Sequence, residues 1–182
     1  SIEVAEKDAL TGLYARDFFY RYCEQLDRNI AGEKDALALD IDRFKLINGL
    51  YGKAFGDKVL IKIAEILVDM VRKNNGLVCR PNADTFLIYQ DHLQDYDAFV
   101  MQLNEAVNAA LGNTHIRLRI GIYENADQTI DVLTRFDRAH IACEKAKDNY
   151  SHPYEVYDEV SHHQQLESQK YISAMEDALK YR

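Results

Sequence analysis

The segment Ala36-Leu37-Ala38-Leu39-Asp40-Ile41-Asp42 reads as a buried strand that ends in acidic residues. A continuous apolar run of this length is typical of a central strand with both faces covered. Acidic side chains at such a strand end face the open end of the sheet, where carboxylate and carbonyl oxygens can hold a hard cation such as Mg²⁺. Solvated strand-end acids are the more common alternative. The segment alone leaves both interpretations open.

The hydrophobic pattern on either side of this strand predicts a sheet flanked by helices. Apolar residues recur at helical spacing in some segments, whereas short apolar or alternating runs mark further strands. Their order, β-α-β-β-α-β with added helices, indicates an α+β fold with a mostly antiparallel central sheet and helices packed around it. The predicted helices cover 16–31, 59–71, 99–110, 132–143 and 164–181, and the further strands cover 77–80, 86–89, 116–122 and 154–157.

Composition limits the classes of function. The chain has 182 residues, 47% of them hydrophobic, and a formal net charge of −8. This length supports one core without disulfides, and the acidic balance argues against nucleic acid or an anionic membrane as a partner. The three cysteines are far apart and indicate neither a zinc site nor a disulfide framework. Because no segment could span a membrane and the chain begins with Ser1, we expect a cytoplasmic piece of a longer protein, with any membrane anchor upstream.

A second acidic residue is predicted to lie at a neighbouring strand end. The predicted strands 77–80 and 86–89 flank the turn Pro81-Asn82-Ala83-Asp84 and form a hairpin. Asp84 then stands at the tip of this strand pair. Two carboxylates and a strand-end carbonyl suit a Mg²⁺–nucleotide site in which the phosphates supply further ligands.

Several linked motifs resemble the GGDEF (diguanylate cyclase) family. They are Asp8-Ala9-Leu10-Thr11-Gly12-Leu13, then D-I-D-x-F-K-x-I-N over 40–48, and Phe55-Gly56-Asp57, in the family's order and spacing. Residues 80–86 fall where the family's R-x-G-G-D-E-F signature belongs, and the resemblance runs from about 8 to 158. It implies a nucleotidyl-cyclase palm-like fold and the joining of two GTP molecules into cyclic di-GMP.

The resemblance also implies ligands for a metal ion and for the guanine base. Asp40, the Ile41 carbonyl and Asp84 match the metal-binding positions, with Mg²⁺ as the expected ion in the presence of nucleotide. Asn48 and Asp57 match the residues that read the guanine edge. This pairing is chemically reasonable, because a carboxylate accepts from guanine N1–H and N2–H₂ while an amide donates to ring acceptors.

The resemblance further implies phosphate contacts. Phe44 and Lys45 match a turn that contacts the phosphates, and Lys147 matches a late lysine that reaches them. Outside this context Asn48 is equally a turn residue, and Lys147 is equally a solvated helix end. The late G-R-N segment of the family reads Asn149-Tyr150-Ser151, so a second phosphate-binding cation is missing.

At the signature itself the chain departs from the family. Asn82-Ala83-Asp84-Thr85-Phe86 stands in place of G-G-D-E-F, so both glycines and the glutamate are absent. Glycine lets backbone amides approach a triphosphate at positive φ; Asn tolerates that φ, whereas the Cβ of Ala83 intrudes. Thr85 removes a carboxylate from the reaction centre, which lowers the rate of cyclisation steeply. We therefore assign no catalytic residue and expect no efficient cyclase activity.

Three functions remain open. The leading one is a degenerate, inactive GGDEF domain that acts as a GTP-sensing or structural regulatory module in cyclic di-GMP signalling. The second is a weak homodimeric diguanylate cyclase, and the third is a dimerisation spacer that binds no nucleotide. Just upstream of the hairpin, where many relatives have an inhibitory R-x-x-D product site, the chain reads Lys73-Asn74-Asn75-Gly76, so feedback by product is not expected there.

The pattern divides the chain into a GGDEF-like domain over 1–160 and a linker helix over 161–182. The last helix has only a narrow apolar stripe, formed by Ile172, Met175 and Leu179, so it should pack on something that continues the chain. It resembles the helix that leads into an EAL phosphodiesterase domain in GGDEF–EAL proteins. A downstream EAL domain and a homodimer of the full-length protein are the implied partners.

Overall fold

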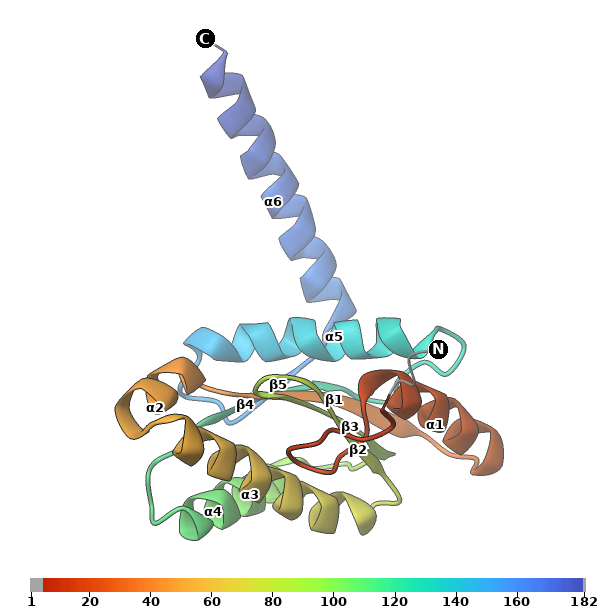
Figure 1. Cartoon of the computed structure of the whole chain (residues 1–182). Helices are drawn as coiled ribbons and strands as arrows, with labels where there is room; N and C mark the ends of the chain where they lie inside the picture. Colours follow the sequence, from red (N-terminus) through yellow and green to blue (C-terminus); the bar gives the residue numbers. More distant parts are fainter. Residues whose placement is uncertain (1–4, 182) are drawn as a thin grey trace.

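The computed structural model describes residues 5–181, and a five-stranded sheet forms its centre (Figure 1). β1 (Lys34–Ile41) is the middle strand of the order β2-β3-β1-β4-β5 and pairs antiparallel with both neighbours. The predicted α+β fold with a mostly antiparallel sheet is confirmed, including the edge position of the last strand. The other strands are β2 (Leu77–Asn82), β3 (Thr85–Asp91), β4 (Leu118–Tyr123) and β5 (Glu155–Val156), of which β5 runs parallel to β4.

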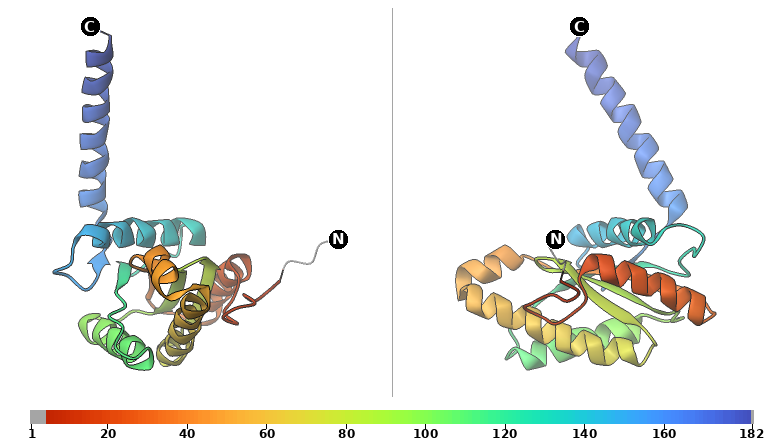
Figure 2. Two further views of the ribbon diagram at one scale, coloured as in Figure 1. Left: turned by 60° about the vertical axis from the view of Figure 1, so that its left-hand side comes forward. Right: turned by 45° about the vertical axis from the view of Figure 1, so that its right-hand side comes forward.

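Helices cover the two faces of the sheet as separate layers (Figures 1 and 2). α3 (Lys53–Arg72) and α4 (Asp97–Ala110) lie on one face. α1 (Arg16–Asn29) and α5 (Val132–Lys145) lie on the other. These four helices agree with the helical spacing in the sequence to within a few residues, except that α3 begins six residues before the apolar pattern does.

The alternation of side chains along β1 divides the core between these layers. Leu37, Leu39 and Ile41 belong to the cluster with α3 and α4. Ala36 and Ala38 belong to the cluster with α1 and α5. Because successive strand residues point to opposite faces, Asp40 lies on the same face as Ala36 and Ala38, beneath α5.

α2 (Phe44–Tyr51) is a helix that the sequence pattern did not predict. Phe44 and Lys45 were expected in a turn, and this prediction is wrong: both lie in the first turn of α2, while Asp42 and Arg43 form the turn before it. Arg43 has a left-handed φ of 54°. The helix is only eight residues long and buries none of them fully. Phe44 and Ile47 pack against the core, but so short an apolar stripe is a weak signal for a helix.

The close approach of α5 to β4 depends on Gly121. A Cβ at this position would lie 2.1 Å from the backbone nitrogen of Cys143 and 2.2 Å from the carbonyl oxygen of Ala139. α5 therefore packs with its backbone directly against the sheet. In this arrangement the Cys143 thiol donates to the carbonyl oxygen of Arg119 at 3.5 Å.

α6 (Glu159–Lys180) extends away from the rest of the domain (Figure 2). The carboxylate of Asp158 caps its first turn by accepting from the backbone N–H groups of Val160 and Ser161. No residue of α6 within the described range is buried. Among the helices of residues 5–181, none is long and apolar enough to cross a membrane.

At the opposite end of β1 from Asp40, the buried carboxylate of Asp35 joins three segments of the chain. It accepts from the Tyr96 hydroxyl at 2.6 Å and from the backbone N–H groups of Leu93 and Asn125 at 3.1 and 2.8 Å. Nδ1 of His92 lies 2.8 Å from Oδ1 of Asp35, the oxygen that also accepts from Asn125. The hydrogen bond to the Asp35 carboxylate raises the pKa of His92 above its ordinary value of 6.5.

This pair predicts a pH dependence of stability. Because the folded-state pKa of His92 is raised, its contribution is complete below about pH 6.5 and is lost as the pH rises through the folded-state pKa. Replacing His92→Gln should lower the melting temperature by about 1–3 °C at pH 5.5 and by less at pH 8.5. The exposed His163→Gln provides the control. An equal loss at both pH values would contradict the assignment.

Candidate functional site

An ion pair dominates the C-terminal end of β1. Asp40 lies between Thr85 of β3 and Arg119 of β4 in the strand register. Nε and Nη2 of Arg119 donate to the two carboxylate oxygens of Asp40 at 2.6 and 2.9 Å. The side chains of Arg119 and Asp40 are only 14% and 17% exposed. This is the bidentate geometry in which a guanidinium binds a carboxylate most strongly.

Burial raises the pKa of the Asp40 carboxyl, while the Arg119 guanidinium opposes this rise and the Asp84 carboxylate adds to it. Asp84 is close because its Oδ2 accepts from the backbone N–H of Ile41 at 3.4 Å. The structure therefore brings Asp40, Ile41 and Asp84 to one end of the sheet. Their assignment as metal ligands stays a prediction.

The side chains at this end do not form a ready cage for Mg²⁺. The ion prefers six oxygen ligands in octahedral geometry, but both oxygens of Asp40 are bound by Arg119. Thr85 stands where the family's signature has a further carboxylate. Among residues 5–181 there is no group of three or more His, Cys, Asp or Glu side chains placed to hold a metal ion. The Mg²⁺ that the family resemblance implies does not fit the site as it is folded.

The hairpin turn beside Asp40 holds a backbone conformation that favours glycine. Ala83 has a φ of +26°, whereas Asn82 is the last residue of β2 and pairs with Thr85. The positive φ therefore falls on Ala83 and not on Asn82, which was the residue expected to tolerate it. The turn is held in place because Arg80 donates from Nε to the Ala83 carbonyl at 2.8 Å and from Nη1 to Asp8 at 2.9–3.0 Å.

The strain at the turn can be measured. Ala83→Gly should stabilise the domain by about 0.5–1 kcal/mol in urea denaturation, because glycine adopts this φ without a steric cost. The control is Ala109→Gly, on the exposed side of α4, which should destabilise by about 0.5–1 kcal/mol. Destabilisation by both substitutions would show that Ala83 is not strained.

At the junction of α2 and α3, Asn48 lies against Gly56, the residue before Asp57. Oδ1 of Asn48 is buried and has no hydrogen-bond partner within the described part of the chain. A Cβ on Gly56 would lie 1.8 Å from this oxygen, so glycine is needed for the side chain to lie against α3. Asp57 follows Gly56 directly and is half-buried. An unpaired buried acceptor is costly. Because this oxygen packs against α3, the Nδ2 group is the part of the Asn48 amide that would contact a base.

The cationic candidates lie on segments near the same end of the sheet. Lys45 is exposed in the first turn of α2, and Lys147 is exposed in a short 3₁₀-helix (Ala146–Asp148) that follows α5. Arg117 connects these segments: Nη2 donates to the Ala146 carbonyl at 2.8 Å, and Nη1 lies 3.5 Å from Asp42. Figure 1 shows the end of α5 beside α2.

Sequence reasoning did not predict the roles of Arg117 and Arg119. A signal was present, because alternation along 116–122 places both arginines on the same, wetter face of the predicted strand. The partner of Arg119 depends on the register between β1 and β4, in which Asp40 lies directly opposite Arg119. No local pattern specifies that register.

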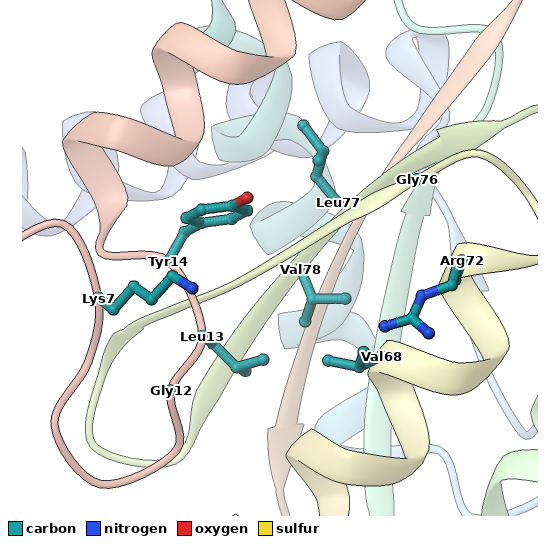
Figure 3. Close-up of a pocket in the computed structure, with 9 residues that line it drawn as sticks. All are labelled: Lys7, Gly12, Leu13, Tyr14, Val68, Arg72, Gly76, Leu77 and Val78. Atoms are coloured by element: carbon teal, nitrogen blue, oxygen red, sulfur yellow. The ribbon is translucent and has the colours of Figure 1, made fainter.

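A separate pocket of about 280 Å³ lies between the N-terminal segment, α3 and β2 (Figure 3). Lys7 and Arg72 approach it from opposite sides, and the apolar side chains of Leu13, Val68 and Val78 lie between them. The pocket is at the other end of β2 from the hairpin turn.

The segment 73–76 lies beside this pocket, and its asparagines are bound to β3. Nδ2 of Asn74 donates to Gln90 at 3.3 Å, and Nδ2 of Asn75 donates to Asp91 at 2.8 Å. Both side chains thus anchor the turn between α3 and β2. The absence of product feedback at this segment stays a prediction.

A palm-like sheet with acidic residues at the end of its central strand, next to a hairpin turn, defines a domain of the nucleotidyl-cyclase type. The family described as "Diguanylate cyclase, GGDEF domain" matches residues 5–152. The chain therefore belongs to the GGDEF family, and it is a GGDEF domain of cyclic di-GMP signalling.

Relatives and solved structures agree with this assignment. The chain is 30% identical over 158 residues to the diguanylate cyclase TpbB of Pseudomonas aeruginosa, covering 79% of the chain and 36% of TpbB. A microbial GGDEF domain studied with cyclic di-GMP superposes with a TM-score of 0.68 at 22% identity, over 84% of this chain and 99% of that one. The S helix–GGDEF–EAL structure of LapD from Vibrio cholerae gives a TM-score of 0.64 at 18% identity, over 84% and 36%.

These curated relatives are longer than the chain. The matching 79% of the chain spans 36% of TpbB, and in a Sinorhizobium fredii protein that is 33% identical over 155 residues it spans 18%. GGDEF domains in general use Mg²⁺ with GTP. What this domain does with either ligand is a separate question.

Proposed function

We propose that this chain is a catalytically inactive GGDEF domain that serves as a cytoplasmic regulatory module in cyclic di-GMP signalling. The ion pair of Asp40 with Arg119 carries this proposal. Cyclisation needs an α-phosphate polarised by a metal and a 3′-hydroxyl held in line with it. With Asp40 bound by Arg119 and Thr85 in place of an acid, the domain lacks the carboxylates that would hold that metal.

We further propose that the domain still binds GTP. Asp57 would accept from guanine N1–H and N2–H₂, and the Nδ2 group of Asn48 would donate to ring acceptors of the base. Lys45 and Lys147 are exposed and free to approach phosphates. Mg²⁺ would accompany the triphosphate as its counter-ion. Binding without turnover is the expected behaviour.

Calorimetric titration with GTP and with ATP tests this proposal. Asp57→Ala should weaken GTP binding by about ten- to a hundred-fold and leave ATP binding unchanged, because a charged hydrogen-bond acceptor of guanine is lost. Asp69→Ala, an exposed position on the same helix, should leave both affinities unchanged. Equal affinity of the unaltered domain for GTP and ATP would contradict guanine recognition.

The same experiments would also identify either of the two other functions. Cyclic di-GMP detected by chromatography after long incubation with GTP and Mg²⁺ would identify a weak homodimeric cyclase. Absence of any GTP binding would leave a structural spacer. The exposed apolar residues of α6 are consistent with the spacer as well as with the sensing function.

We also propose that residues 1–160 form the GGDEF unit and residues 161–182 a linker toward an EAL phosphodiesterase domain, in a homodimeric full-length protein. Residues 1–4 and 182 of these units lie outside the described residues. Support comes from the exposed side chains of Ile172, Met175 and Leu179 on α6 and from the likeness to the GGDEF–EAL structure of LapD.

The parent open reading frame tests this arrangement directly. An EAL domain after Arg182 is expected, and its phosphodiesterase turnover should change when GTP is added at saturating concentration. A stop codon or an unrelated domain immediately downstream would contradict the proposal. An EAL domain whose turnover does not respond to GTP would restrict this chain to a structural role.

A further inference from the structure

We propose that Arg119 takes the place of a divalent cation at the end of β1. The guanidinium neutralises Asp40 from within the fold, so that Asp40 and Asp84 together bind no Mg²⁺. The domain has thereby exchanged a metal site for an internal ion pair. This inference concerns the metal alone and holds whether or not the domain binds GTP.

The geometry places the two cations in competition for Asp40. Both oxygens of Asp40 accept from Arg119, at 2.6 and 2.9 Å. A magnesium ion binds a carboxylate oxygen at about 2.1 Å, which would bring it close to the guanidinium. Like charges at that separation repel strongly in a site that is screened from water. A metal ion that binds Asp40 therefore has to overcome the repulsion of Arg119 or displace it.

The fold also holds Arg119 in place. Its Cα lies directly opposite that of Asp40 in the β1–β4 register. Its carbonyl oxygen accepts from the Cys143 thiol, on an α5 helix that packs closely because residue 121 is glycine. The ion pair thus joins two neighbouring strands beneath a helix, and the Arg119 side chain is only 14% exposed.

The charge left at the site is too small to attract a divalent ion strongly. Asp40 and Asp84 would present two negative charges to a metal, but the bound Arg119 cancels one of them. Asp84 also directs Oδ2 toward the N–H of Ile41. Affinity for hard cations depends on the number of charged oxygen ligands, so the remaining site is weak.

Arg117 provides an internal comparison. It precedes Arg119 by two residues and therefore points to the same face of the sheet. Its Nη1 is 3.5 Å from Asp42. Its Nη2 donates to the backbone carbonyls of Ala146 and Asn149 at 2.8 and 3.2 Å. Arg117 makes no contact with Asp40 among the hydrogen bonds of residues 5–181, so removing it takes away a positive charge without freeing that carboxylate.

The experiment is a titration of the full chain with Mn²⁺ in the absence of nucleotide, followed by electron paramagnetic resonance of the free ion. The unaltered chain should show no Mn²⁺ site that depends on Asp40. Arg119→Ser should tighten Mn²⁺ binding about ten-fold or more, because it frees both oxygens of Asp40. Arg117→Ser should behave as the unaltered chain does. The double substitution Asp40→Asn, Arg119→Ser should lose the gained site.

Two results would overturn the proposal. One is Mn²⁺ binding by the unaltered chain that disappears in Asp40→Asn. The other is a folded Arg119→Ser variant, judged by circular dichroism, that binds Mn²⁺ no better than Arg117→Ser. If Arg119→Ser does not fold, the comparison of the unaltered chain with Asp40→Asn decides alone: equal binding supports the proposal, and a loss overturns it. Since no GTP is present, none of these results depends on guanine recognition.

Discussion

The confinement of β1 is the constraint on which the rest of the structure depends. Both of its edges pair with other strands, and both of its faces are covered by helices. A strand held in this way cannot shift by one residue without moving its leucines to the face where Ala36 and Ala38 now pack. The position of Asp40 between Thr85 and Arg119 follows from that fixed register. The chemistry at the strand end is therefore set by the packing of the whole sheet.

Arginine–carboxylate pairs join separate elements of the fold. Arg80 ties the N-terminal segment to the hairpin through Asp8, and Arg135 of α5 reaches Asp27 of α1 at 2.6 Å. Arg119 belongs to the same class of contact. A planar guanidinium binds a carboxylate through two parallel bonds, which fixes orientation as well as distance.

The sequence predicted the fold better than it predicted the site. The alternation and helical spacing of apolar residues are local properties, and they located β1, the hairpin and the long helices correctly. α2 was missed because it is short, half-exposed and preceded by Arg43 in a left-handed conformation. The pairing of Arg119 with Asp40 joins residues 79 positions apart and depends on strand register. Motif spacing could predict that Asp40 and Asp84 lie at the same site, but it could not reveal which cation Asp40 binds.

The residues that maintain this fold differ from those that would perform cyclisation. The core packing does not depend on the residues of the hairpin turn. It is formed by side chains such as Leu37 and Leu39 and by the close contact of Gly121 with α5, whereas Ala83 in the turn is exposed. The turn can therefore lose its glycines at the cost of local strain while the core stays intact. The loss of a metal would be more serious, because an unpaired Asp40 at 17% exposure would carry an uncompensated charge. Arg119 removes that cost, so the same residue that closes the metal site preserves the strand end as part of a stable fold.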